Sequence, residues 1–331
     1  MRNTKPTGIK SIAILRTDRI GEVLLSTPII EAMHRAFPGA QVTFITSPYS
    51  RDIVSDRPDL AGVLSFDTIE RRVPLWEAFS LAGLLRKKRF DMAIILNPHR
   101  VLHLACFLAG IRYRLGFDRK WGFLLNRKAR DKRQESKMHE VEYNLRLLKR
   151  IGIEQRNIPP FMPVLSKSAF YVGGILQQSG VSGKNKIIAV HPGSSNPKKR
   201  WPKENFRKLI KDIISTGSVD VVLIGDRDEK QLCNEISEGL GKSVHNLAGL
   251  FTIRKLTAFL KAVELLITND NGPMHIAAAC GTKVVAIFNG NLKGSNPTRW
   301  GPYGEGHTVL YKPMNEISVE EIYEAVKKIL A

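Results

Sequence analysis

The sequence predicts an α/β protein made of two halves of similar size, each built around a parallel sheet. Short apolar runs typical of buried strands alternate with longer amphipathic segments, which is the pattern expected of βαβ units. The 331 residues exceed one ordinary core, and a proline-rich segment at residues 158–164 separates two such series. We therefore expect domains at residues 1–163 and 164–331.

In the first half, three apolar runs predict strands over residues 11–16, 41–46 and 91–96. Apolar side chains recur at helical spacing over residues 21–37, which predicts one helix there, and a short helix is expected near residues 48–55.

In the second half, strands are predicted over residues 187–191, 219–224, 265–268 and 283–288. Helices are expected over residues 203–216 and 229–239. The last helix, residues 318–330, begins with Ser318 and Glu321 at the spacing of a capping box. No repeat at the level of residues relates the two halves.

The composition indicates a globular protein with an anionic partner. Hydrophobic residues make up 43% of the chain, while 51 basic and 31 acidic residues give a formal charge of +20. Nucleic acid and a phosphorylated lipid surface would both satisfy this charge, and charge alone does not choose between them. Basic residues are dense at 127–133, where a solvated loop without a partner is the alternative to an anion-binding segment.

Cysteine usage and hydropathy fit a protein of the cytoplasm. Cys106, Cys233 and Cys280 are widely spaced in apolar contexts, which favours neither a disulfide framework nor a zinc site. No segment approaches the roughly 18 apolar residues of a spanning helix, and the N-terminal apolar run is too short for a signal peptide. Any membrane contact is therefore expected to be peripheral.

The first candidate site is the segment RTDRIGEVLLSTP at residues 16–28, which follows the first predicted strand. Ligands of open parallel sheets bind at the carboxyl ends of strands. Glu22 and Asp18 place carboxylates there, and both could instead serve only to complement a helix N-terminus. The two interpretations stay open on spacing alone.

Two further polar loops follow strands of the second half. The segment HPGSSNPKKRWP at residues 191–202 offers the hydroxyls of Ser194 and Ser195 and the charge of Lys199, a plausible phosphate cradle without Walker A order. The segment GDRDE at residues 225–229 places carboxylates where a ribose diol could bind. A polar turn and helix capping are the respective alternatives.

The fourth segment, residues 265–288, combines an apolar strand, a polar turn and a helix that starts at Pro273. Backbone N–H groups at such a helix start attract anions, and Asp270 and His275 lie beside them. His275 could also be an ordinary helix-face histidine. One anionic, sugar-like ligand would explain why four polar loops follow strands in both halves.

These segments, together with NLAG at residues 246–249 and DNGPMHIAAA at 270–279, resemble the ADP-heptose:lipopolysaccharide heptosyltransferases of glycosyltransferase family 9. The resemblance implies a GT-B fold, in which two Rossmann-like domains face each other across a cleft. It implies an N-terminal acceptor half, a C-terminal nucleotide-sugar half and a last helix that packs back on the first domain. No metal and no cofactor are implied.

The resemblance further implies an inverting transfer of heptose from ADP-heptose to the lipopolysaccharide core, by a cytoplasmic protein peripheral on the inner face of the inner membrane. The family's catalytic aspartate corresponds to Glu22, with Asp18 as the alternative. The donor-binding positions are Ser194, Ser195, Lys199, Glu229, Asp270, Asn271, Gly272 and His275.

Two other functions fit part of this sequence. A family member that uses another nucleotide sugar would carry the same loops. A nucleic-acid-binding protein would fit the charge, but only Trp121 and Phe123 lie near the basic run as stacking aromatics, and no helix-turn-helix, RRM or KH signature is present. No specific nucleic-acid partner is therefore expected.

Overall fold

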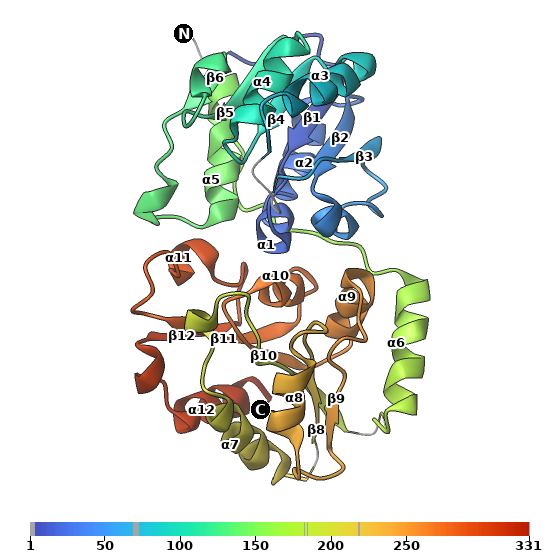
Figure 1. Ribbon diagram of the computed structural model, residues 1–331, viewed down its shortest axis with the longest axis vertical. Coiled ribbons are helices and arrows are strands. Elements are labelled where there is room, and N and C mark those ends of the chain that lie inside the picture. The colour runs from blue at the N-terminus through green and yellow to red at the C-terminus, as the bar shows by residue number, and fades with distance from the viewer. Residues whose placement is uncertain (1–3, 69–72, 182, 184, 218, 331) are drawn as a thin grey trace. The chain divides into compact units, whose positions relative to one another are not determined.

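The computed structural model describes residues 4–68, 73–181, 183, 185–217 and 219–330 (Figure 1). The chain divides into two compact units, Met1–Phe161 and Met162–Ala331, and each is described by itself. Each unit contains one six-stranded sheet in which every paired strand is parallel. The predicted α/β class with two parallel sheets is confirmed.

The sheet of the first unit has the order β3-β2-β1-β4-β5-β6. Its strands are β1 (Ser11–Leu15), β2 (Gln41–Thr46), β3 (Gly62–Ser65), β4 (Met92–Ile95), β5 (Tyr113–Phe117) and β6 (Arg127–Ala129). Its helices are α1 (Ile20–Leu24), α2 (Pro28–Ala36), α3 (Glu77–Lys88), α4 (Arg100–Leu108) and α5 (Glu140–Leu147), with 3-10 turns η1 (Pro48–Ile53), η2 (Gly122–Leu124), η3 (Arg133–Glu135) and η4 (Leu148–Ile151).

Both faces of this sheet are covered, as the apolar runs of its central strands require. Leu15 of β1 and Ile95 of β4 pack in one buried cluster with Leu85 of α3 and Leu102 of α4. Helices α2 and α5 contact each other and pack on β2 and β5 respectively. The strand order reverses between β1 and β4, which is the switch point where ligands of such sheets bind.

The helix predicted over residues 21–37 is two helices, and the reason lies at Pro28. Proline has no N–H to continue a helix, so α1 ends at Leu24 and α2 begins at Pro28. Between them, the hydroxyls of Ser26 and Thr27 donate to the carbonyl oxygens of Glu22 (2.7 Å) and Leu24 (2.8 Å). Glu22 therefore sits on a short helix of its own at the end of β1.

The sheet of the second unit has the order β12-β11-β10-β7-β8-β9. Its strands are β7 (Lys186–His191), β8 (Val219–Leu223), β9 (Val244–Asn246), β10 (Leu265–Asn269), β11 (Lys283–Asn289) and β12 (Thr308–Lys312). Its helices are α6 (Ser166–Gln178), α7 (Lys203–Ile214), α8 (Lys230–Ser237), α9 (Ile253–Lys261), α10 (Gly272–Ala279), α11 (Pro297–Trp300) and α12 (Val319–Leu330), with 3-10 turns η5 (Pro197–Lys199) and η6 (Met314–Glu316).

The last helix, α12, packs within the second unit. Its side chains Ile322 and Val326 join the buried cluster that contains Phe206 of α7 and Ile287 of β11. Its apolar face lies against α7 and β11, where it completes the cover of the second sheet. That this helix also packs back on the first half of the chain stays a prediction.

The described residues of the two units include no membrane-spanning helix, and the three thiols are buried. Among the described residues, no helix combines the length and apolarity needed to cross a bilayer. Cys106, Cys233 and Cys280 are buried and unpaired, and burial raises the pKa of the first two thiols to about 12 and of the third to about 11. These thiols are packing residues.

Candidate active site

At the switch point of the first sheet, hydrogen bonds join the loop that follows β1 to the loop that follows β4. The Oδ1 of Asn97 accepts from the backbone N–H of Thr17 at 3.3 Å, and its Nδ2 donates to the Thr17 hydroxyl at 3.0 Å. The turn that carries Asp18 and Glu22 is therefore fixed to the neighbouring strand rather than free in solvent.

A buried arginine holds one of the two candidate carboxylates. Nε of Arg16 donates to Oδ1 of Asp18 at 2.7 Å, and Nη1 lies 3.1 Å from Oε1 of Glu140. Arg133 reaches the same Glu140 oxygen at 3.3 Å, and both arginines donate to the carbonyl oxygen of Leu96. Arg16 is only 2% exposed, so water screens its charge weakly and its attraction to the carboxylates of Asp18 and Glu140 is strong.

Glu22 has the electrostatics of a proton acceptor. Burial raises the pKa of its carboxyl group, and the negative charge of Asp18 raises it further, against the opposing charge of Arg16. Among the described residues, Glu22 makes no ion pair within 4.0 Å, whereas Asp18 is already bound to Arg16. Of the two carboxylates, Glu22 is thus the one better suited to take a proton from a hydroxyl group.

At the switch point of the second sheet, two asparagines join the loops that follow β7 and β10. Asn269 donates to the carbonyl oxygen of Pro192 at 2.7 Å and accepts from the N–H of Trp201 at 3.0 Å. Asn271 donates to the carbonyl oxygen of Gly193 at 3.1 Å, and its Nδ2 lies 2.8 Å from Nδ1 of His191. These bonds give the polar loops one fixed arrangement.

Lys199 and Asp270 form an ion pair at this edge of the sheet. Nζ of Lys199 lies 2.6 Å from Oδ2 of Asp270, and the hydroxyl of Ser295 donates to the same oxygen at 2.8 Å. Asp270 is buried, whereas Lys199 is partly exposed and can reach a ligand. The pair joins the loop after β7 to the loop after β10.

Glu229 lies against the loop that follows β7. Its Oε2 is 3.3 Å from Nε2 of His191 and accepts from the N–H of Asp226 at 3.0 Å. Burial alone would raise the pKa of this carboxyl group, but the hydrogen bond and charge of His191 hold it below its ordinary value. A Cβ on Gly193 would lie 1.8 Å from Oε1 of Glu229, so a larger residue at this position would displace the Glu229 carboxylate.

The remaining predicted donor residues lie on the same loops. Ser194 is buried and accepts from the N–H of Asn196 at 3.4 Å, whereas Ser195 is exposed. Gly272 begins α10, and His275 is buried on that helix. All eight predicted donor residues thus follow β7, β8 or β10, which are neighbours in the sheet.

The structure adds side chains that sequence reasoning did not single out. Arg16 stands inside the quoted segment 16–28, and His191 heads the segment 191–202, so their positions were a usable signal. No pattern in the sequence indicated that Glu140 or Ser295 belongs to the site. Among the described residues, no group of three or more His, Cys, Asp or Glu side chains has the arrangement of a metal site.

Two parallel sheets with polar loops at their switch points define a two-domain α/β protein of the GT-B type. The structure is similar to that of a family 9 glycosyltransferase from Veillonella parvula, with a TM-score of 0.88, 21% identity and 99% of each chain covered. It also resembles E. coli ADP-heptose lps heptosyltransferase II, with a TM-score of 0.81, 24% identity and coverage of 97% of this chain and 98% of that one.

The chain belongs to glycosyltransferase family 9 (heptosyltransferase), whose pattern it matches over residues 78–328. It is 27% identical over 286 residues to lipopolysaccharide heptosyltransferase 2 of Escherichia coli K12, covering 84% of this chain and 82% of that protein. It is 25% identical over 313 residues to the lipopolysaccharide core heptosyltransferase OpsX of Haemophilus influenzae, covering 91% and 84% respectively. The family resemblance inferred from the motifs is confirmed.

Proposed function

We propose that this protein is an inverting glycosyltransferase that moves a heptose from ADP-heptose to a hydroxyl group of the lipopolysaccharide core. The names of its relatives support this reaction, and so does a solved structure with a similar fold, E. coli heptosyltransferase WaaC with ADP-2-deoxy-2-fluoro heptose, at a TM-score of 0.74. The observation that carries the proposal is Glu22, a carboxylate of raised pKa at the switch point of the first sheet.

In the proposed step, the Glu22 carboxylate takes the proton of the acceptor hydroxyl as its oxygen attacks the anomeric carbon of the heptose. The bond from that carbon to the diphosphate oxygen breaks on the opposite face, and its electron pair leaves with ADP. Attack opposite to departure inverts the anomeric carbon. A base on the acceptor side and positive charge on the diphosphate side are the two requirements.

The second unit would hold the donor. Lys199 and the backbone N–H groups of Asn271 and Gly272 would face the diphosphate, and Asp270 would accept hydrogen bonds from sugar hydroxyls. Glu229, kept ionised by His191, would accept from the ribose diol. The hydroxyls of Ser194 and Ser195 and the side chain of His275 complete the proposed donor site.

The family resemblance implies an aspartate at the position of the proposed base, where this chain has Glu22, whose side chain is longer by one methylene. A displacement of about an ångström can cost on the order of a hundredfold in rate. We propose that the acceptor pocket accommodates the longer side chain, so Glu22→Asp should be slower than the native enzyme.

The decisive experiment measures ADP release from ADP-heptose with a purified lipopolysaccharide core acceptor. Glu22→Gln should lower kcat about 10²–10⁴-fold, the usual share of a general base, and leave the affinity for ADP-heptose unchanged. Glu31→Gln, the same substitution at a half-buried surface position of α2, serves as the control. Full turnover of Glu22→Gln would show that Asp18 or another group is the base.

Donor identity is tested separately by thermal unfolding with a panel of nucleotide sugars. ADP-heptose should raise the melting temperature most, because a ligand that binds only the folded state stabilises it. A larger shift with another nucleotide sugar would assign the chain to that donor instead. No shift with any ADP-sugar would contradict the proposal.

We also propose that the protein is cytoplasmic and binds the anionic inner face of the inner membrane peripherally. The exposed side of α3 and the chain before it carries Trp76 (65% exposed), Phe79 (65%) and Leu84 (37%), followed by Arg86, Lys87 and Lys88. Exposed aromatics beside basic residues are typical of interfacial helices. Trp76→Ser with Phe79→Ser should weaken sedimentation with vesicles rich in phosphatidylglycerol and leave activity on a soluble acceptor unchanged.

No resident metal or cofactor is part of the proposed reaction, because Lys199 supplies the positive charge at the diphosphate. A chelator should therefore leave kcat unchanged, and a loss restored by Mg²⁺ would contradict this point. For nucleic acid we expect only weak, salt-sensitive binding, as for any protein of charge +20.

A further inference from the structure

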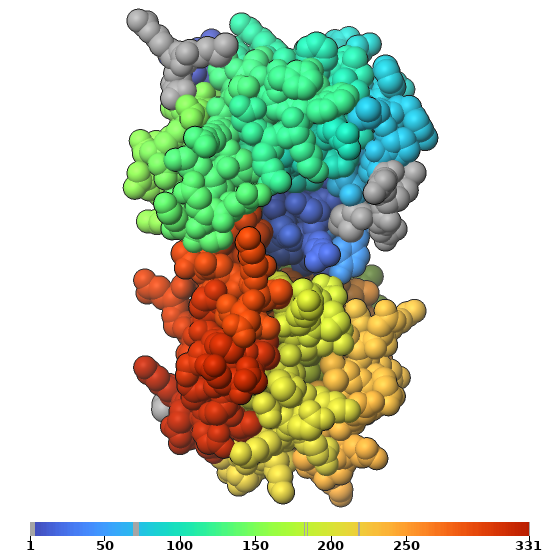
Figure 2. All heavy atoms as spheres, turned by 60° about the vertical axis from the view of Figure 1, so that its left-hand side comes forward, coloured from blue at the N-terminus to red at the C-terminus, as the bar shows by residue number. Residues whose placement is uncertain are grey.

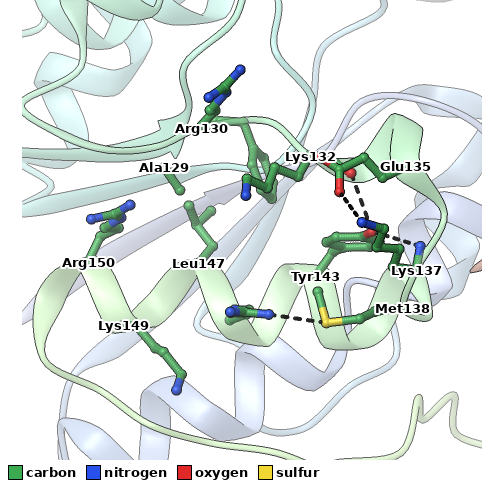
Figure 3. A pocket seen from close by; sticks show the side chains of 12 residues that line it. Ala129, Arg130, Lys132, Glu135, Lys137, Met138, Tyr143, Leu147, Lys149 and Arg150 are labelled. Atoms are coloured by element: carbon green, nitrogen blue, oxygen red, sulfur yellow. Dashed lines mark hydrogen bonds and ion pairs between the residues drawn. The ribbon is translucent and has the colours of Figure 1, made fainter.

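A groove of about 570 Å³ lies on the first unit, outside the segments assigned to the transfer reaction (Figure 3). One wall is the chain from the end of β6 to residue 138, and the other is formed by α5 and η4. Apolar side chains contribute to the lining, among them Phe117, Met138 and Leu147. The segment from β6 to η4 is at the surface of this unit, where it is drawn in green in Figure 2. The volume is within the range of small-molecule sites.

The lining of this groove has a strong excess of positive charge. Its cationic residues are Arg130, Lys132, Lys137, Arg146, Lys149 and Arg150. Among the described residues, Glu135 is the single carboxylate in the lining, and Lys137 lies 3.3 Å from it.

Most of these cationic side chains form no ion pair with another described residue of the protein. Lys149 is paired with Glu154, and Arg146 donates to the sulfur of Met138 at 3.4 Å. Arg130, Lys132 and Arg150 form no ion pair within 4.0 Å among the described residues. Figure 3 shows Arg130 and Lys132 extending from the chain after β6, and Lys149 and Arg150 extending from the helical wall.

Cations on both walls of an apolar groove indicate a ligand that carries a concentrated negative charge on an amphiphilic body. A phosphate monoester has close to two negative charges at neutral pH and several acceptor oxygens, and arginine forks bind it through paired hydrogen bonds. We propose that this groove binds a phosphate monoester, of a phosphorylated saccharide acceptor or of a lipid head group, as a second contact outside the transfer site.

A chain of ion pairs connects the groove to the turn that carries the proposed base. Arg133, next to Lys132 in sequence, shares the carboxylate of Glu140 with Arg16, which holds Asp18. Strands β6 and β1 are three places apart in the sheet, a separation of about 14 Å at the usual strand spacing. A phosphorylated acceptor a few sugar units long would therefore span the distance from the groove to the Glu22 turn. This acceptor role rests on the proposed function.

The test compares the native chain with a Lys132→Gln, Arg150→Gln double variant. A matched control, Lys211→Gln with Lys242→Gln, removes two exposed charges from the second unit. The probes are the water-soluble glucosamine disaccharide 1,4′-bisphosphate and phosphatidylcholine vesicles that contain either phosphatidic acid or phosphatidylglycerol. Calorimetry should give a Kd for the disaccharide at least about tenfold weaker in the groove variant, and within twofold of native in the control.

Each probe separates one source of the phosphate. If the groove variant loses affinity only for the disaccharide, the groove binds a saccharide acceptor. If the variant loses affinity only for vesicles with phosphatidic acid, and not for those with phosphatidylglycerol, the groove binds a lipid phosphate monoester. Equal affinities in the groove variant and the control, or no binding of either monoester probe by the native chain, overturn the proposal. ADP release from ADP-heptose is measured in parallel with a phosphate-free acceptor, so failure of the transfer reaction and failure of the groove are seen independently.

Discussion

Arg16 and Glu140 form a buried ion pair, Nη1 to Oε1 at 3.1 Å, although 124 residues separate them in the chain. The pair joins the end of β1 to the start of α5. Two charges taken out of water are stable together only with good geometry and additional hydrogen bonds, and Arg133 and the carbonyl oxygen of Leu96 provide these. The consequence is that the arginine beside the proposed base has a fixed position.

The first prediction concerns stability. Glu140→Gln removes the carboxylate shared by Arg16 and Arg133 and leaves both guanidinium groups buried near each other. We expect the free energy of unfolding to fall by about 3 kcal/mol, as when one partner of a buried pair is removed. Urea unfolding followed by circular dichroism measures this, with Glu238→Gln at an exposed position as control. A loss below about 1 kcal/mol would mean that the buried arginines do not depend on this carboxylate.

The second prediction is a shift of the pH–rate profile. The charge of Asp18 raises the pKa of Glu22, so Asp18→Asn should lower that pKa, and the released charge of Arg16 acts in the same direction. A base with a lower pKa stays deprotonated to lower pH. The acidic limb of kcat/KM should therefore move to lower pH, while Asp212→Asn in the second unit leaves it in place. A limb that moves upward or stays unchanged would exclude Glu22 as the titrating group.

Much of the fold could be predicted from the sequence because its signals are local. Apolar runs such as residues 11–16 and 265–268 can only be buried, and their alternation with amphipathic segments specifies parallel sheets. The two sheets share one relative strand order although no sequence repeat relates them, because the order follows from βαβ connections rather than from side chains. The break at Pro28 was missed because the apolar spacing continues across it.

From the sequence, the loops that form the candidate site could be predicted, but the contacts between their side chains could not. Position at the end of a strand indicated the loops that carry Glu22, Lys199 and Asp270, and the family resemblance then assigned these three residues their expected roles. Pairings such as Arg16 with Glu140, or Asp270 with Ser295, depend on which distant segments the topology brings together, and no local pattern encodes that. The basic residues of the groove were visible as a charge run, but their second wall on α5 was not.

The third prediction uses the close approach of Gly193 and Glu229. A methyl group on residue 193 would lie 1.8 Å from the Glu229 carboxylate, so Gly193→Ala should displace that carboxylate and raise KM for ADP-heptose about tenfold. Gly173→Ala on α6 is the control, since no atom lies within 4 Å of its added methyl group. The control should leave KM unchanged and stabilise the chain by about 0.5–1 kcal/mol. An unchanged KM in Gly193→Ala would remove Glu229 from the donor site.

The fourth prediction separates the catalytic role of Lys199 from its structural one. Lys199→Met removes the cation 2.6 Å from the buried Asp270 carboxylate. The departing diphosphate then loses its neutralising charge, and we expect kcat to fall about 10²–10³-fold. The single variant should also lose stability, because a buried carboxylate is left without its partner.

In the double variant Lys199→Met, Asp270→Asn, the uncompensated charge is gone, so most of the lost stability should return while kcat stays low. Lys198→Met, at the exposed neighbouring position, controls for the loss of one lysine and should match the native enzyme in both measurements. Thermal unfolding and ADP release measured on the same samples distinguish the cases. If kcat returned together with stability in the double variant, Lys199 would be a structural partner of Asp270 and the charge on the leaving diphosphate would have to be met elsewhere.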